Sequence, residues 1–225
     1  MSFQIYNWLE EYADEVVKTF GYRIWFIGLQ GSYARGEATE ASDIDIVLIL
    51  DELRASDLRI YRRMLDTLSE RERICGFVSG RAELENWDKS DLFQFCKDTV
   101  PIKGSLDAIF ETIGTGDIER GIRTGACNIY HMACHNMIHE QQIGILADLY
   151  KAAVFVLQAQ YYLKTGKYIG RATELFPKLS GQSREILYIA IAMKKAGERR
   201  KLTLDELSEK LIQWTSLVIR ENTLV

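Results

Sequence analysis

The stretch GSYARGEATEASDIDI, residues 31–46, joins two short apolar runs and decides the fold of the first half of the chain. The run before it covers residues 24–29, and the second run extends from Ile44 to Leu50. Short apolar runs bounded by glycine and polar residues are typical of buried strands. Gly31 and Ser32 predict a tight turn that opens a short helix, with Ser32 as its N-cap. We therefore expect a strand, a glycine turn, a helical turn, a loop and a second strand.

Two features of this stretch indicate phosphate and metal chemistry. The free backbone N–H groups of a helix that begins near Gly31 and Ser32 can bind a phosphate. Asp43 and Asp45 are two residues apart, so on a strand their carboxylates leave the same face and can share a divalent cation. Such a pair is costly unless a cation neutralises it. The alternative is a pair of aspartates that cap a solvated strand edge.

The Gly-Ser turn, the short helix and the Asp-x-Asp strand resemble the DNA polymerase β-like nucleotidyltransferase superfamily. The likeness is greatest to small bacterial members, which include the minimal nucleotidyltransferases and the aminoglycoside and lincosamide nucleotidyltransferases. It covers about residues 24–50 and is loose beyond them. It implies a transferase that uses a nucleoside triphosphate and one or two Mg²⁺ ions. Asp43 and Asp45 would hold the metal, and Gly31 and Ser32 would bind the β- and γ-phosphates.

The resemblance also implies a third carboxylate on the strand beside Asp-x-Asp. Asp91 fits best because it begins the run Leu92 to Cys96, which we predict to be a strand. The predicted catalytic and metal-binding residues are therefore Asp43, Asp45 and Asp91. The rivals of Asp91 for the third place are Glu83, Glu85 and Asp98.

The predicted nucleotide-binding residues are Gly31, Ser32, Arg35 and Gly36. Arg35 and Gly36 suit a turn-shaping role, and Arg35 is also long enough to reach a phosphate.

Composition sets limits on the class of protein. The chain has 225 residues, of which 47% are hydrophobic and 27% charged, enough for one large domain or two small ones with a core each. The net charge of −4 argues against a broad basic face for long nucleic acid. The N-terminus has no signal-peptide pattern, and no stretch is expected to reach the length of a membrane span. We expect a cytoplasmic protein with no membrane partner.

A change of pattern near residue 104 predicts two domains and an α+β fold. Residues 1–104 are expected to form a small nucleotidyltransferase domain with a mixed sheet of about four or five strands. Residues 105–225 are expected to form an all-helical bundle, because only helical periods appear there. The helices predicted around the sheet cover residues 4–19 and 56–73, and a further strand covers residues 74–78. The helices predicted in the bundle cover residues 106–113, 129–162, 183–195 and 204–219.

The helical half contains all three histidines, His131, His135 and His139, each four residues from the next. Such spacing keeps them on one face of a helix. They could be core or interface residues, a general base, or ligands of a transition metal, and the sequence does not choose between these roles. Lys151 could neutralise the outgoing pyrophosphate. The basic run 194–201 is expected to be a solvated loop.

These observations predict an Mg²⁺-dependent nucleotidyltransferase. It would move a nucleoside monophosphate, AMP in the first instance, from a nucleoside triphosphate to a hydroxyl of a small-molecule acceptor held between the domains. An antibiotic is one option for this acceptor. The alternative is an antitoxin-like or nucleotide-sensing binding module that acts on or with a protein partner. The sequence leaves open the acceptor, the preferred base and the oligomeric state, a homodimer included.

Overall fold

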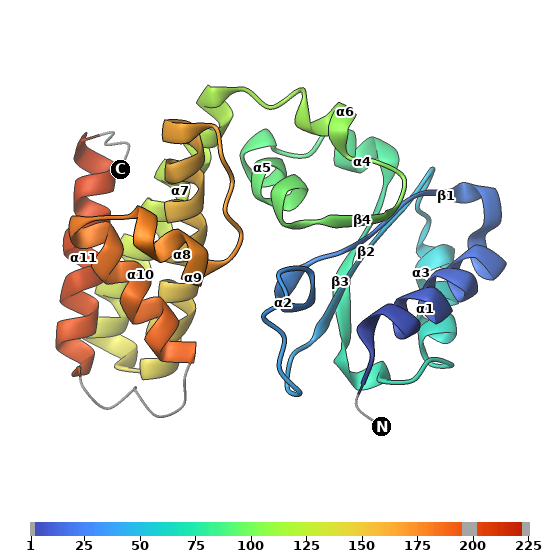
Figure 1. The fold of residues 1–225 in the computed structure, drawn as a ribbon, viewed down its shortest axis with the longest axis horizontal. Helices are drawn as coiled ribbons and strands as arrows, with labels where there is room; N and C mark the ends of the chain where they lie inside the picture. Colours follow the sequence, from blue (N-terminus) through green and yellow to red (C-terminus); the bar gives the residue numbers. More distant parts are fainter. Residues whose placement is uncertain (1–2, 195–201, 222–225) are drawn as a thin grey trace. The chain divides into compact units, whose positions relative to one another are not determined.

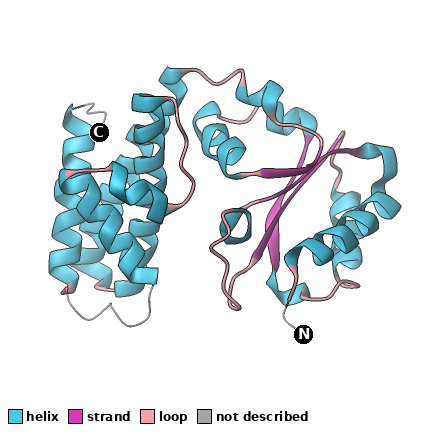
Figure 2. Ribbon diagram, in the orientation of Figure 1, coloured by secondary structure: helices cyan, strands magenta, loops and turns pink. Residues whose placement is uncertain are grey.

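The computed structural model describes residues 3–194 and 202–221 and has the expected α+β fold (Figure 1; Figure 2). Contacts divide the chain into two compact units. The first comprises Met1–Asp88 with Phe95–Thr112, and the second comprises Lys89–Gln94 with Ile113–Val225. The single boundary predicted near residue 104 therefore falls within the first unit.

The first unit is built around a four-stranded mixed sheet in the order β3-β2-β1-β4. Its strands are β1 (Ile24–Leu29), β2 (Ile44–Leu50), β3 (Ile74–Gly80) and β4 (Val100–Lys103). Strand β1 runs antiparallel to β2 and β4, and β2 runs parallel to β3. The predicted mixed sheet and its first three strands are thus confirmed.

The fourth strand is not the predicted one. Residues 91–96 lie in helix α5 (Lys89–Asp98), where Leu92 and Phe93 are buried and Cys96 is half-buried. Leu92 and Cys96 are four residues apart, and Phe93 is next to Leu92. This spacing places the three side chains on one face of a helix and does not fit a strand. The actual fourth strand, β4, contains Pro101, which pairs with Gly28 at the edge of the sheet. An edge strand tolerates proline because one of its sides needs no backbone donor.

Two helices, α1 (Ile5–Phe20) and α3 (Ala55–Leu65), lie along the same face of the sheet (Figure 1). Apolar side chains of these helices and of the strands form one buried core between them. Gly21, at φ 57°, ends α1. The predicted helix 56–73 is shorter, and a 3₁₀ turn at Arg71–Arg73 leads into β3.

The remaining short helices of this unit are α2 (Gly31–Ala34), α4 (Arg81–Glu85), α6 (Asp107–Phe110) and a 3₁₀ turn at Gly21–Arg23. On the face of the sheet away from α1, the ring of Phe77 packs edge-on against Phe95 and Trp87, with ring centroids 5.1 and 5.5 Å away. These aromatic contacts seat the second half of α5 in the first unit.

The second unit is a helical bundle, as predicted. Its helices are α7 (Thr115–His135), a π-helical segment (Asn136–Glu140), α8 (Ile143–Thr165), α9 (Ala172–Leu175), a 3₁₀ turn (Phe176–Lys178), α10 (Gly181–Lys194) and α11 (Leu204–Glu221). The predicted helix 129–162 is therefore two helices. The break comes at Gln141, which has a left-handed φ of 52°, and the buried Asn136 amide bonds to both backbone groups of Gln142 at 3.0 and 3.1 Å.

Glycines lie at one end of two of these helices. Gly166, at φ 69°, caps the end of α8. Gly114 is the N-cap of α7, and the Asp117 carboxylate accepts from its N–H at 3.0 Å. The basic run predicted as a loop lies outside the described residues beyond Lys194.

Helix α8 is long and apolar enough, by length and composition, to be a candidate membrane span, with a mean hydropathy of 1.3 in its best window. The prediction that no stretch reaches this length is therefore wrong. Core helices meet the same criterion, and 44% of that window is buried in the structure. Because α8 packs against α7, α10 and α11, these contacts account for its apolar character.

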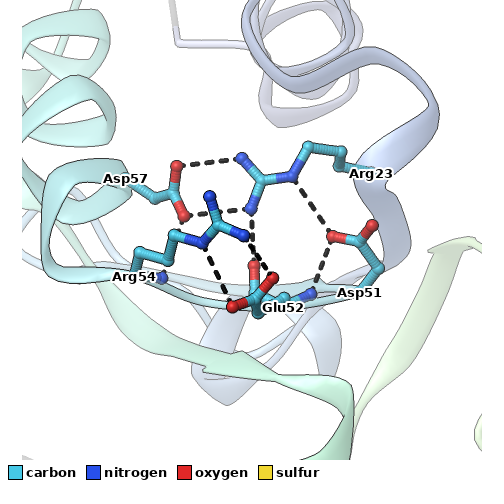
Figure 3. A network of polar contacts seen from close by, with 5 residues as sticks. All are labelled: Arg23, Asp51, Glu52, Arg54 and Asp57. Atoms are coloured by element: carbon cyan, nitrogen blue, oxygen red, sulfur yellow. Dashed lines mark hydrogen bonds and ion pairs between the residues drawn. The ribbon is translucent and has the colours of Figure 1, made fainter.

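A charged network secures the connection from β2 to α3 (Figure 3). The Arg23 guanidinium donates to both carboxylate oxygens of Asp57, at 2.9 and 3.0 Å, and to the Glu52 carbonyl at 2.7 Å. The Asp57 carboxylate also accepts from the N–H of Arg54, the N-cap residue of α3, at 2.9 Å, and so closes the start of this helix. Asp57 is only 4% exposed. The hydrogen bond from Arg23 is the main cause that lowers the pKa of Asp57 from 3.8 to about 2.

We expect Asp57→Asn to lower the melting temperature by several degrees at neutral pH, because it leaves Arg23 with the exposed Asp51 and without its buried anionic partner. Since the folded pKa is the depressed one, the contribution of Asp57 is fully present above about pH 4 and is lost as pH falls toward 2. Thermal melts from pH 7 to pH 2 should therefore show the wild-type and variant curves converging. The matched control is Glu52→Gln, an exposed partner of Arg54. A constant difference down to pH 2 would contradict this assignment.

Candidate active site

The Asp-x-Asp pair lies at the start of β2. Asp43 is exposed just before the strand, and Asp45 is half-buried as its second residue. Ile44 and Ile46 point into the core beneath α1 and α3. Because successive strand residues alternate, Asp45 leaves the opposite face. Asp43 precedes the strand, so the common face of the two carboxylates stays a prediction.

Gly31 brings the glycine turn directly against Asp45. It has a left-handed φ of 69°, and a Cβ added there would lie 1.9 Å from Oδ2 of Asp45. Only a residue without a side chain allows the carboxylate to rest on this backbone. The Gln30 N–H also donates to the Asp45 carbonyl at 2.8 Å. The turn and the acid thus form one unit.

Helix α2 begins two residues earlier than predicted. Its N-cap is Gln30, whose side chain makes no capping bond, and Ser32 lies inside the first turn. The prediction of Ser32 as N-cap is therefore wrong. The N–H groups of Gly31, Ser32 and Tyr33 belong to a first helical turn, which has no carbonyl of its own helix to bind. These free N–H donors can still bind an anionic oxygen. The first of them, at Gly31, lies beside Asp45.

Arg73 connects the two halves of the signature, although it belongs to no motif of the sequence. Its Nε and Nη2 both donate to the Ser42 carbonyl, at 3.1 and 3.0 Å, immediately before Asp43. Nη2 also donates to the Tyr33 hydroxyl on α2. Glu70 accepts from Nη1 at 2.6 Å, and the guanidinium lies 4.9 Å from the centroid of the Phe3 ring. One side chain therefore holds the loop that carries Asp43 in register with α2.

Replacing Arg73 by glutamine should reduce the kcat/KM of the reaction at this site about tenfold or more, because the loop before Asp43 loses its anchor. Arg73→Lys should recover little, since an ammonium cannot form the same fork. The matched control is Arg71→Gln. Arg71 belongs to the same 3₁₀ turn, and its guanidinium pairs with the exposed Asp66 at 2.8 Å. Steady-state kinetics with a thermal melt of each variant measure the effect. Equal kinetics for the two glutamine variants would contradict the role of Arg73.

Arg35 faces acids rather than open solvent. Its guanidinium pairs with Asp98 at 3.1 Å and with Glu37 at 3.5 Å. A second hydrogen bond joins the α2 region to the end of α5: the Gln30 side-chain amide donates to the Thr99 hydroxyl at 2.6 Å. These contacts support the turn-shaping role considered for Arg35. Gly36, exposed at φ 66°, likewise completes the turn after α2.

The third carboxylate is not found where it was expected. Asp91 lies in the first turn of α5 and belongs to the second unit, so the argument for it as a strand residue beside Asp-x-Asp is wrong. The strand that does pair with β2 on this side, β3, contains no acid, and Cys75 lies opposite Asp45. Of the rivals, Asp98 pairs with Arg35 and Glu85 pairs with Arg81 at 2.7 Å. The carboxylate of Glu83, in α4, lies against Gly80 at the end of β3.

The donor set at this site fits a magnesium ion that arrives with a triphosphate. Among residues 3–194 and 202–221 there is no group of three side chains able to hold a metal by themselves. Mg²⁺ is commonly bound by one or two carboxylates together with substrate phosphates and water. Asp45, which rests on the Gly31 turn, and the exposed Asp43 two residues before it are carboxylates of this kind.

The histidine row forms a separate surface feature. Ring centroids lie 6.3 Å apart for His131 and His135, and 4.8 Å apart for His135 and His139. His131 and His139 are exposed, and Nε2 of His135 lies 3.6 Å from Glu140. Lys151 is exposed on α8 beside Asp148 in another hollow of the second unit.

Comparisons with known proteins agree with this geometry. The family model described as nucleotidyltransferase domain matches residues 9–104. A candidate protein adenylyltransferase of Methanocaldococcus jannaschii is 44% identical over 55 residues. That match covers 24% of this chain and 52% of the relative, so the chain spans about half the length of the curated relative it matches.

A solved structure has a similar fold. It is spectinomycin adenyltransferase AAD(9) from Enterococcus faecialis, solved with ATP and spectinomycin. The TM-score is 0.56 over 92% of this chain and 98% of that one, with 13% sequence identity. At this identity the likeness concerns the fold, and it extends over both the sheet-containing unit and the helical unit.

Proposed function

We propose that this protein is an Mg²⁺-dependent adenylyltransferase that acts on a hydroxyl of a small-molecule acceptor, because residues 9–104 match the nucleotidyltransferase domain. The observation that carries the proposal is the contact between Gly31 and Asp45, which joins a phosphate-binding turn to a metal-binding acid. The similar fold of a solved adenyltransferase that binds a small antibiotic supports the choice of donor and acceptor.

Each residue of the signature has a defined task in this proposal. Asp43 and Asp45 would hold Mg²⁺, which neutralises phosphate charge and orients the triphosphate. The first turn of α2, with Gly31 and Ser32, would bind the β- and γ-phosphate oxygens through backbone N–H groups. The acceptor oxygen would attack the α-phosphorus in line, and pyrophosphate would leave. Positioning and charge stabilisation, which need no covalent enzyme intermediate, would account for the rate.

The proposal is tested by measuring pyrophosphate release from ATP with Mg²⁺ against a panel of hydroxylated small molecules, aminocyclitol antibiotics included. We expect release that depends on both Mg²⁺ and one acceptor of the panel. Mass spectrometry of that acceptor should show the addition of one AMP. ATP consumption that yields orthophosphate in place of pyrophosphate would contradict the proposal.

A second candidate function is adenylylation of a protein hydroxyl. The observation that favours it is the 44% identity over 55 residues to the candidate protein adenylyltransferase. The two functions share the nucleotide site and differ in the acceptor. Incubation of the protein with α-labelled ATP and a lysate would label a protein band in the second case and only small molecules in the first.

A further inference from the structure

The second unit contains a cavity of about 310 Å³ that the nucleotidyltransferase site does not include. Its walls come from the first turns of α5, from α7 and from α8, all within this unit. The volume is at the lower end of the range for small-molecule sites. Asp91, whose predicted role at the metal is not supported by its position, lies in the lining.

The cavity has an apolar floor and a polar mouth. The floor is formed by buried side chains of Phe93, Ile118, Ile122, Val156 and Ala159. Three lining residues, Asp91, Thr124 and Asn128, are exposed polar residues. This combination of an apolar floor with a few polar groups at one end is the common design of ligand pockets.

Asp91 gives the cavity its charge. Among the described residues that line it, Asp91 is the one with an ionisable side chain. Within the part of the chain that the structure describes, the Asp91 carboxylate makes no side-chain hydrogen bond or ion pair. A carboxylate at the mouth of an apolar pocket attracts a cation whose body fills the pocket.

Close helix packing fixes the wall that bears Asp91. A Cβ added at Gly121 of α7 would lie 3.2 Å from the carbonyl oxygen of Ser90, the residue before Asp91. One turn further along α7, a Cβ added at Gly125 would lie 2.9 Å from Cγ2 of Val156 on α8. The Gln94 amide, one turn along α5 and also in the lining, donates to the Tyr168 hydroxyl at 2.5 Å. The cavity is therefore built on rigid elements.

From these observations we propose that the cavity binds a small organic cation, with its ammonium group at Asp91 and its apolar body over Phe93 and Phe155. The aromatic rings add a favourable surface for a cation that lies between them and the carboxylate. This inference concerns binding by the helical unit and does not depend on nucleotidyl transfer. It gives Asp91 a role that its place in α5 permits.

The test compares a charged probe with its neutral analogue. 2-Phenylethylamine and 2-phenylethanol have nearly the same shape, and only the first is a cation at pH 7. Binding to the full-length protein is measured by titration calorimetry and by amide chemical shifts in NMR spectra. We expect saturable binding of the amine in the millimolar range, at least threefold weaker binding of the alcohol, and shifts centred on Thr124 and Asn128.

Three variants complete the test. Asp91→Asn should weaken amine binding about three- to tenfold and leave alcohol binding unchanged, as expected for an ion pair at a partly exposed site. Ala152→Leu should fill the cavity and weaken both probes. Asp148→Asn, which removes an exposed acid of α8 outside this cavity, is the matched control. The proposal is overturned if the amine shows no saturable binding, if the alcohol binds as tightly, or if Asp91→Asn binds the amine like the wild type.

Discussion

Asp45→Asn is expected to reduce nucleotidyl transfer by on the order of 10³-fold, with the fold intact. The substitution keeps the shape of the side chain beside Gly31 and removes the charge that, in the proposed function, would hold Mg²⁺ with the triphosphate. Charge stabilisation by a bound metal amounts to several kcal/mol, and each 1.36 kcal/mol corresponds to about a tenfold change in rate. Asp43→Asn should have a similar effect, because the site has no third acid on the neighbouring strand β3.

These variants are measured by pyrophosphate release at saturating ATP and by MgATP binding in a calorimeter. The matched control is Glu40→Gln, which removes an exposed acid from the same loop. We expect the control to retain wild-type turnover and the aspartate variants to lose the Mg²⁺-dependent part of ATP affinity. Full turnover in either aspartate variant would remove the basis for the metal site.

Gly31→Ala is expected to have the second largest effect, a loss of about 10²-fold in kcat/KM. The added methyl would overlap Oδ2 of Asp45, at 1.9 Å, and would force the carboxylate or the turn to move. A displacement of about 1 Å in a catalytic site can cost about 10²-fold in rate. The variant also places alanine at a left-handed φ of 69°, which should lower stability by about 1 kcal/mol.

Gly21→Ala separates these two consequences. Gly21 has a similar φ of 57°, lies in the same unit and has no atom within 4 Å of an added Cβ. Both variants should therefore lose similar stability in denaturant titrations, and only Gly31→Ala should lose activity. If Gly21→Ala were equally inactive, backbone strain and not the contact with Asp45 would be the cause.

The strands that flank the signature could be predicted because their information is local. Residues 24–29, 44–50 and 74–78 are short apolar runs bounded by glycine or polar residues, and all three fall within strands. The run 91–96 looks similar in sequence and forms a helix instead. Apolar runs of this length do not distinguish a strand from a buried helix, because the choice depends on what the run packs against. Here Phe93 packs on Tyr162, with ring centroids 5.0 Å apart.

Only part of the candidate site could be predicted from the sequence. Gly31, Ser32, Asp43 and Asp45 form one continuous stretch, and their spacing alone indicates a turn beside an acidic strand. Arg73 could not be found from this pattern, because its contact with Ser42 joins residues far apart in the chain. The same holds for Asp98, which reaches the signature through Arg35. Contacts of this kind follow from the tertiary fold and leave no periodic signal in the sequence.

The central claim is that this protein transfers the α-phosphoryl group of ATP together with its nucleoside. The most direct measurement follows two labels in parallel reactions that contain an active acceptor and Mg²⁺, one with α-labelled ATP and one with γ-labelled ATP. The account predicts that the α-label moves to the acceptor and that the γ-label leaves as pyrophosphate, with neither transfer in Asp45→Asn. Transfer of the γ-label to the acceptor, or equal transfer of the α-label by Asp45→Asn, would contradict it.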